Sequence, residues 1–240
     1  MKFTSLEFVL FFVVFFFLYW FVFNRNSKSQ NIFLLLGNYL FFAWWDWRFL
    51  SLLIGSSIIN YVLGIHINKT TIEKRRSFLI LIGLVANLGV LVFFKYYNFF
   101  AASLSDGFAA INIQIHLSSL NLLLPLGISF YTFRAISYLL DIDNETIEPA
   151  KDWVAFFAYL SFFPTLLAGP IDRAKHFIPQ LLVKRTFDYD QASGGLRKIL
   201  WGLFKKVVIA DNCVLLTNYI FNNYTDLPSS TLLIGSFLYC

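Results

Sequence analysis

Apolar residues run along this chain in blocks long enough to be membrane helices. A helix needs about 20 apolar residues to cross roughly 30 Å of hydrocarbon. The blocks reach or approach that length once the aromatic residues at their ends are included, and polar stretches separate them. They cover residues 8–23, 32–45, 50–67, 78–94 and 120–140. The pattern predicts five membrane spans within residues 6–140.

The next apolar segment, residues 153–168, has a different character. It is too short for an ordinary span, and Pro164, Gly169 and Pro170 interrupt it. Proline removes a backbone donor and restricts the residue before it to extended conformations. At membrane depth, backbone freed in this way is tolerated only where it is buried in protein or lines a cavity. We therefore expect residues 153–170 to form a re-entrant or broken helix.

The basic residues indicate an orientation. Most of the 19 Lys and Arg residues lie in segments 24–30, 68–77 and 172–198, whereas segments 46–49 and 98–119 hold only Arg48. Loops rich in Lys and Arg stay in the cytoplasm. This rule places the three basic segments inside, the N-terminus outside, and the two flanks of the broken helix on one side of the membrane.

Residues 196–221 predict an interfacial helix that leads into a further span. Trp201 and Phe204 alternate with basic residues, including Lys205 and Lys206, and Asp211 follows. A basic amphipathic helix of this kind lies in the membrane interface and attracts anionic lipid. The fold class predicted for the whole chain is all-α: one polytopic transmembrane helical bundle of about six to seven spans, with the re-entrant or broken helix and the cytoplasmic basic segment 172–198.

Composition agrees with a membrane protein. The chain is 58% hydrophobic and 20% aromatic, and only 14% of its residues are charged, against about 25% in soluble domains. This excludes a collagen, a disordered protein, a disulfide scaffold and a nucleic-acid-binding module. Cys213 and Cys240 do not have the spacing of metal ligands, so no metal site is predicted. The first apolar run has no small-residue cleavage site, and we interpret it as a retained span.

Arg134 is the clearest charge inside an apolar block. A charge in mid-span costs about 2.5–3.5 kcal/mol on insertion scales, so it is a functional candidate. Asp141 follows seven residues later, on roughly the same helical face. One interpretation is that Arg134 contacts a phosphate or carbonyl oxygen of a substrate. The other is that Arg134 extends to the interface and pairs with Asp141.

Arg173 follows the break directly and also allows two interpretations. It either binds an anionic group at the mouth of a cavity or only anchors the end of a kinked helix on the cytoplasmic side. A catalytic residue is not predicted, because a nucleophilic serine would need a nearby base. The three histidines, His66, His116 and His176, all lie outside the middle of the apolar blocks.

Several segments, in order, carry a resemblance to a known family. They are LPLGISFYTF at 124–133, ISYLLD at 136–141, SFFP at 161–164, AGPIDR at 168–173, FIPQL at 177–181 and GLFKKVVIAD at 202–211. These stretches resemble the membrane-bound O-acyltransferase family, most closely its alginate O-acetyltransferase branch. The Phe-rich opening and the aromatic cluster at 44–47 are also similar to that branch.

Two features depart from the family pattern. The branch usually has Gln or a similar polar residue at the position of Arg134, and Tyr-Arg where this chain has Asp143 and Asn144. Family members are also about twice as long, and their catalytic His lies in the C-terminal half in a Trp-His-Gly type motif. None of the three histidines here stands in such a motif. The chain therefore resembles the N-terminal half of an acyltransferase without its general base.

The resemblance implies a helical bundle around a tunnel in a bacterial inner membrane. An acyl donor, acetyl-CoA, would present its thioester to a hydroxyl activated by the family's neutral His, in a tunnel that excludes water. The acetyl group would pass to an exported polysaccharide such as alginate, with a secreted or membrane-anchored acetyltransferase as partner. Five residues would line the tunnel or its cytoplasmic side: Arg134, Asp141, Gly169, Pro170 and Arg173. The alternative is a non-catalytic membrane scaffold or transport component.

Overall fold

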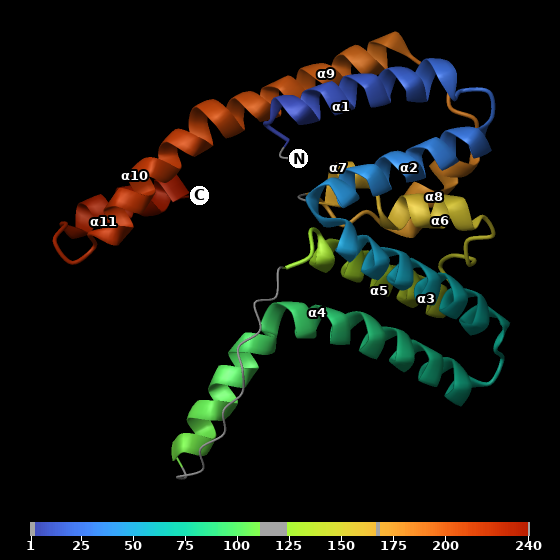
Figure 1. Ribbon diagram of the computed structural model, residues 1–240, viewed down its shortest axis with the longest axis horizontal. Coiled ribbons are helices and arrows are strands. Elements are labelled where there is room, and N and C mark those ends of the chain that lie inside the picture. Colours follow the sequence, from blue (N-terminus) through green and yellow to red (C-terminus); the bar gives the residue numbers. More distant parts are fainter. Residues whose placement is uncertain (1–2, 111–123, 167–168, 240) are drawn as a thin grey trace. The chain divides into compact units, whose positions relative to one another are not determined.

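A computed structural model describes residues 3–110, 124–166 and 169–239, and these residues fold into helices without strands (Figure 1). The chain divides into two units, Met1–Arg185 and Thr186–Cys240, which are described separately below. The helices of the first unit are α1 (Leu6–Phe17), η1 (Leu18–Val22), α2 (Ser27–Asp46), η2 (Trp47–Phe49), α3 (Leu50–Lys69), α4 (Glu73–Ala110), α5 (Ile128–Asp143), α6 (Trp153–Leu160), α7 (Phe163–Leu166) and α8 (Ala174–Leu182). Those of the second unit are α9 (Tyr189–Phe204), η3 (Lys205–Ala210), α10 (Asp211–Asn222) and α11 (Ser229–Tyr239).

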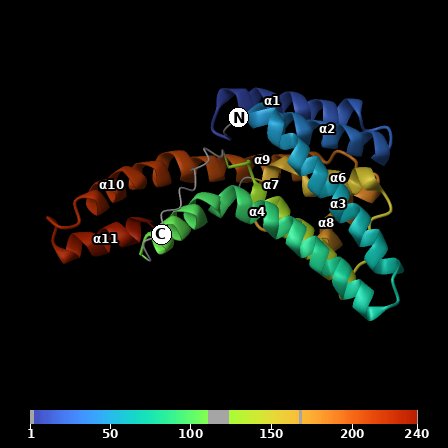
Figure 2. The same cartoon turned by 60° about the horizontal axis from the view of Figure 1, so that its bottom comes forward.

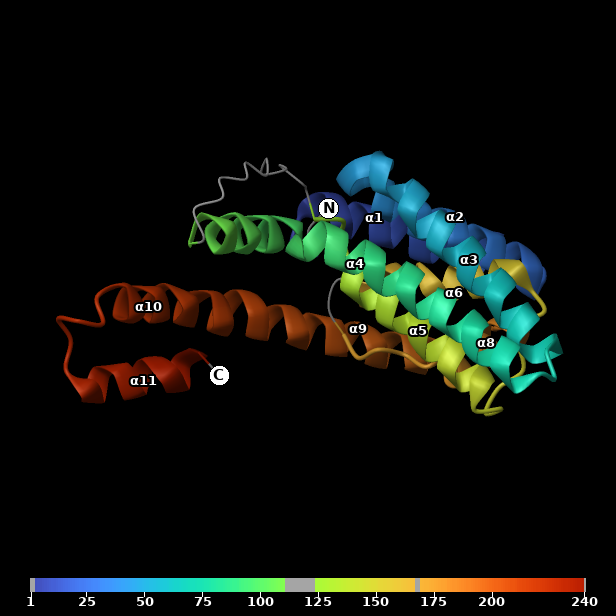
Figure 3. The ribbon, with the colours of Figure 1, turned by 90° about the horizontal axis from the view of Figure 1, so that it is seen from below.

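Helices α3 and α5 and the first part of α4 pack against one another, and the rest of α4 extends away from them (Figures 1 and 3). Glycine permits the close approach at two points. A Cβ at Gly64 of α3 would lie 2.8 Å from Cε1 of Tyr138, and a Cβ at Gly83 of α4 would overlap the side chain of Leu139. Such small residues let membrane helices approach closely where lipid supplies no hydrophobic driving force.

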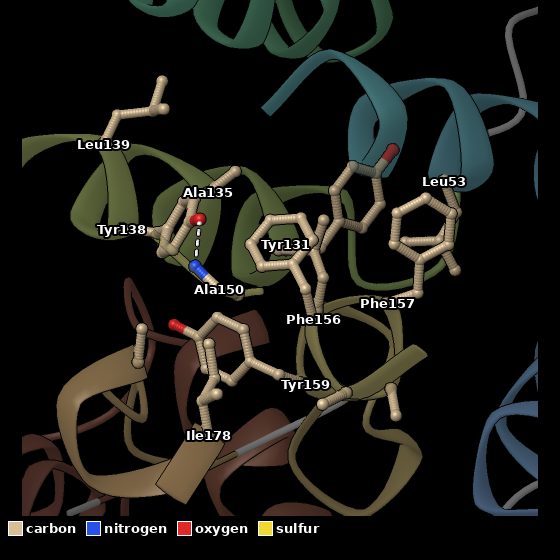
Figure 4. Packing of buried hydrophobic residues seen from close by; sticks show 14 of the residues in the cluster. Leu53, Tyr131, Ala135, Tyr138, Leu139, Ala150, Phe156, Phe157, Tyr159 and Ile178 are labelled. Atoms are coloured by element: carbon tan, nitrogen blue, oxygen red, sulfur yellow. Dashed lines mark hydrogen bonds between the residues drawn. The ribbon is translucent and has the colours of Figure 1, made fainter. Parts of the chain in front are cut away.

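The core of the first unit lies where α5 meets α6 (Figure 4). The rings of Tyr138 and Phe156 lie 4.5 Å apart between centroids. The hydroxyl of Tyr138 accepts a hydrogen bond of 3.1 Å from the backbone N–H of Ala150. Tyr159 and Phe156 are both fully buried. Because the tyrosine hydroxyl has a partner, this aromatic core can bury it at low cost.

Helix α1 lies along α2 and contacts it through aromatic rings (Figure 2). Phe15 stacks on Phe33 at 5.1 Å between ring centroids, and Phe8 meets the edge of Phe41 at 6.0 Å. The other side of α1 is open, since Leu10 and Val13 are about 60% exposed. The Phe-rich sequence of α1 therefore provides both the rings that contact α2 and an apolar surface on the other side of the helix.

Two helical runs in the described residues are long and apolar enough to cross a membrane: Ser27–Lys69 and Glu73–Ser105. Most of each run's apolar stretch is not buried inside the protein, which indicates a membrane location. Length and composition alone do not confirm the six to seven spans predicted above. Helix α4 also extends to Ala110, beyond the predicted end of the fourth span at 94.

The second unit is a long helical run followed by a short returning helix. Helices α9, η3 and α10 continue without interruption from Tyr189 to Asn222, and α11 packs against α10. A Cβ at Gly235 would lie 2.8 Å from the side chain of Ile220, so glycine sets the approach there. Near the middle of the run, Lys206 pairs with Asp211, and Lys205 lies 5.5 Å from the ring centroid of Trp201.

Candidate functional site: a polar cluster around the broken helix

Helix α5 carries the two charged residues singled out in the sequence. It begins after Gly127, whose φ of 65° lies in the left-handed region that only glycine adopts cheaply. A Cβ there would also lie 2.6 Å from Cγ of Leu166. Arg134 and Asp141 are seven residues apart and share the buried face of α5 with Tyr138. Because α5 begins at this point and buries this face, Arg134 and Asp141 both lie against the broken helix or the segment that follows it.

Arg134 has no exposed surface, and its side chain bonds to the broken helix and to the chain just after it. Its Nη2 donates to Oδ2 of Asp172 at 3.0 Å and to the hydroxyl of Thr165. Its Nη1 donates to the carbonyl of Tyr159 at 3.3 Å. The guanidinium also lies 5.8 Å from the centroid of the Tyr159 ring. Arg134 therefore pairs with Asp172, and the predicted pairing of Arg134 with Asp141 is wrong.

Asp141 instead faces Arg173, the neighbour of Asp172. Its Oδ1 lies 3.9 Å from Nη1 of Arg173, whose side chain is 68% exposed. Its backbone carbonyl accepts from the hydroxyl of Thr146 at 2.7 Å. Asp172 thus pairs with Arg134, and its neighbour Arg173 pairs with Asp141, which lies two turns after Arg134 on α5. Two ion pairs of opposite polarity fix the register between α5 and the chain after the break.

Some polar atoms in this cluster are buried without a hydrogen-bond partner. They include Nε of Arg134 and Oδ2 of Asp141. Leaving a buried polar atom unpaired costs about 1–3 kcal/mol, and more for a charged group. The cluster therefore has hydrogen-bonding capacity that the described residues do not use. The Nε–H of Arg134 can donate to a polar or anionic group, whereas Oδ2 of Asp141 can only accept from a donor.

Gly169 and Pro170, the other two candidates, lie on the surface of the first unit. Gly169 has a φ of 154°, and the extended turn it forms with Pro170 leads directly to Asp172. Of the five candidates, the structure brings Arg134, Asp141 and Arg173 into one cluster, and it places these two beside that cluster rather than in its interior. Ala168 of the AGPIDR motif lies outside the described residues.

Asn38 forms hydrogen bonds with groups on both sides of the break between α6 and α7. The sequence did not reveal this role. The amide nitrogen of Asn38 donates to the carbonyl of Ala158 at 3.1 Å and to the hydroxyl of Ser161 at 3.2 Å. Its amide oxygen accepts from the backbone N–H of Phe163 at 3.3 Å. Asn38 is fully buried, and it supplies the partners that broken backbone needs in an apolar setting.

Asn31 has a similar role seven residues earlier on α2. Its amide nitrogen donates to the carbonyl of Leu181 at 2.8 Å, at the end of α8, and its amide oxygen accepts from Arg185. Asn31 is buried as well. Polar amides within an apolar helix are candidates for contacts between helices. The two asparagines within residues 27–46 could therefore have been recognised from the sequence as such candidates. Their partners lie more than 100 residues away and could not be read from it.

His66 and His176 do not join the cluster. Nδ1 of His66 lies 2.8 Å from the carbonyl of Val62, and His176 lies exposed on α8. His116 lies outside the described residues. Among the residues that the structure describes, there is no group of three or more His, Cys, Asp or Glu side chains that could hold a metal ion.

Sequence comparison relates this chain to bacterial O-acetyltransferases. It is 35% identical over 223 residues to the probable alginate O-acetylase AlgI of Pseudomonas aeruginosa, which covers 92% of this chain and 42% of that protein. It is 31% identical over 229 residues to the peptidoglycan O-acetyltransferase of Helicobacter pylori, covering 85% and 42%. A shorter match, 42% identical over 53 residues, is to the teichoic acid D-alanyltransferase of Lacticaseibacillus rhamnosus, covering 22% and 13%.

No family model and no solved structure matches the chain. The chain spans about two fifths of the length of the curated relatives named first. Those relatives nevertheless align with about nine tenths of this chain. The chain is thus a relative of the alginate and peptidoglycan O-acetyltransferases, and its resemblance to the alginate O-acetyltransferase branch of the membrane-bound O-acyltransferases is confirmed.

Proposed function

We propose that this chain belongs to a membrane-bound O-acyltransferase that transfers an acetyl group from acetyl-CoA to a hydroxyl of an exported polysaccharide. The observation that carries the proposal is the buried polar cluster in which α5 and the broken helix are joined by Arg134 and Asp172. The relationship to alginate and peptidoglycan O-acetyltransferases supports the reaction class. We also propose that the acceptor is an exported polysaccharide such as alginate and that a secreted or membrane-anchored acetyltransferase is the partner.

In this proposal the cluster positions groups and does not perform the proton transfer. The general base would be a neutral His that takes the proton of the attacking hydroxyl. His66 contacts the carbonyl of Val62 and His176 is exposed on α8, and neither stands in a Trp-His-Gly type motif. The base would then belong to the portion of the relatives' length that this chain does not span. The free Nε of Arg134 would hold a polar or anionic group of the donor.

The proposed setting is a multi-pass arrangement in the bacterial inner membrane. The basic segments 24–30, 68–77 and 172–198 support a cytoplasmic side for the cluster, where acetyl-CoA is available. Reporter fusions test this arrangement. Alkaline phosphatase should be active when fused within 46–49 and inactive within 68–77 or 172–198, and the reverse result would contradict the orientation.

The activity is tested in membrane vesicles from cells that carry the intact locus. Labelled acetyl-CoA added to the cytoplasmic face should deliver label to polysaccharide, and deletion of the gene for this chain should abolish the transfer. Complementation with the wild-type gene should restore it. Vesicles from the intact locus that transfer no acetyl group would contradict the proposal and favour the alternative, a non-catalytic scaffold or transport component.

A further inference from the structure

An aromatic groove on the first unit ends at a half-buried cation, Arg185. The groove has a volume of about 330 Å³ and is bounded by α1 and η1, the break between α6 and α7, and α8. Its apolar walls include Phe12, Phe16, Trp20 and Phe162. Arg185 is the charged residue among those that line it. This volume lies at the lower end of the roughly 300–1,000 Å³ typical of small-molecule sites.

Arg185 is held in place without an anionic partner. Its Nη2 donates to the amide oxygen of Asn31, and its guanidinium lies 5.6 Å from the centroid of the Tyr19 ring. Its Nε is buried and has no hydrogen-bond partner among the described residues. Among the residues that the structure describes, no carboxylate lies within ion-pair distance of Arg185. Burial lowers the pKa of Arg185, and its interaction with the hydroxyl of Tyr19 partly offsets this, yet arginine stays charged in proteins.

Partial burial of a cation without a counter-ion is unfavourable, and an anion at the buried Nε of Arg185 would offset some of that desolvation. The groove beside it offers rings that suit a flexible apolar chain. Arg185 belongs to the basic segment 172–198, in which Lys175 and Lys184 are exposed. Basic pockets of this kind on the cytoplasmic side bind anionic lipid head groups. One ligand that carries both an anionic group and an apolar chain would pair with Arg185 and pack against the aromatic walls of the groove.

We propose that this groove binds one anionic phospholipid, with a phosphate oxygen on Arg185 and an acyl chain among the aromatic rings. The lipid would fill the space between α1, the broken helix and α8 and would stabilise their packing. This proposal is independent of acetyl transfer, since Arg185 is not a member of the cluster around Arg134.

The test uses the chain purified in detergent and titrated with phosphatidylglycerol or phosphatidylcholine of the same acyl chains. Phosphatidylglycerol should raise the midpoint of thermal unfolding, and native mass spectrometry should show one retained lipid. Arg185→Gln should weaken the binding of phosphatidylglycerol about tenfold, the loss expected from one charge-assisted hydrogen bond worth about 1.4 kcal/mol. Lys184→Gln, which removes the same charge from an exposed neighbour, should stay within about twofold of the wild type.

Two further arms separate the head group from the chain. Glycerol 3-phosphate, which lacks acyl chains, should not stabilise the protein at matched concentration. Gln180→Trp places a ring in the groove from an exposed position on α8, and it should block lipid retention even if Arg185→Gln fails to fold. Equal effects of the two lipids, equal losses for Arg185→Gln and Lys184→Gln, or full retention in Gln180→Trp would overturn the proposal.

Discussion

Nη2 of Arg134 lies 3.0 Å from Oδ2 of Asp172, and this contact joins α5 to the chain just after the broken helix. The side chain of Arg134 is fully buried, whereas that of Asp172 is 30% exposed. The hydroxyl of Tyr159 donates to the backbone carbonyl of the same aspartate at 3.0 Å. Asp172 therefore organises the candidate site through its side chain and its backbone together.

Neutralising Asp172 should destabilise the protein much more than neutralising its neighbour. Asp172→Asn leaves a buried guanidinium without its anion, and we expect a loss of about 2–3 kcal/mol. Arg173→Gln breaks a contact of 3.9 Å made by a side chain that is 68% exposed, and we expect less than about 1 kcal/mol. Reversible unfolding in mixed micelles measures both. Equal losses would show that the two ion pairs are equivalent.

The broken helix should depend on the buried amide of Asn38. Asn38→Ala removes the partners of the Ala158 carbonyl and the Phe163 N–H, which should cost about 1–3 kcal/mol for each group left unpaired. Leu40→Ala on the same helix is the matched control, because Leu40 is 54% exposed and alanine favours helix. An Asn38→Ala variant as stable as the control would mean that the break needs no support from α2.

Gly127 should not tolerate a side chain. Gly127→Ala combines a left-handed backbone, which costs roughly 1–2 kcal/mol in an L-residue, with a Cβ 2.7 Å from the carbonyl oxygen of Leu166. Gly89→Ala in α4 is the control, since a Cβ there would have no atom within 4 Å. We expect the first variant to lower the thermal midpoint and the second to leave it unchanged or raise it. The opposite order would contradict this account of how α5 begins.

Asn60 and Asn87 should contribute a measurable coupling between α3 and α4. Each amide donates to the other, at 3.1 Å from Asn60 and 2.8 Å from Asn87. Hydrogen bonds between membrane helices average about 0.6 kcal/mol in double-mutant cycles and reach about 1.7. A cycle of Asn60→Ala, Asn87→Ala and the double variant should give a coupling in this range. Additive single effects would show that the reciprocal bonds contribute nothing beyond each residue's local contacts.

Only some of the candidate site could be predicted. Arg134, Asp141 and Arg173 are recognisable because a charge beside an apolar block or a helix break stands out in the sequence. Asp172 was missed although it is the direct partner of Arg134, because a charge at the edge of a basic segment gives no local signal of burial. Asn31 and Asn38 were missed for a related reason: an amide on an apolar helix indicates some contact but does not name the partner.

The sequence alone determined the helical class and predicted a broken helix within residues 153–170, because hydrophobic blocks and prolines act over a few neighbouring residues; the structure places the break between Leu160 and Phe163. Tertiary structure decided which polar groups meet. Asn38 and Phe163 are 125 residues apart, and Arg134 and Asp172 are 38 apart. Such pairs form only when packed helices bring them together, because a buried polar group must find a partner wherever the fold places one.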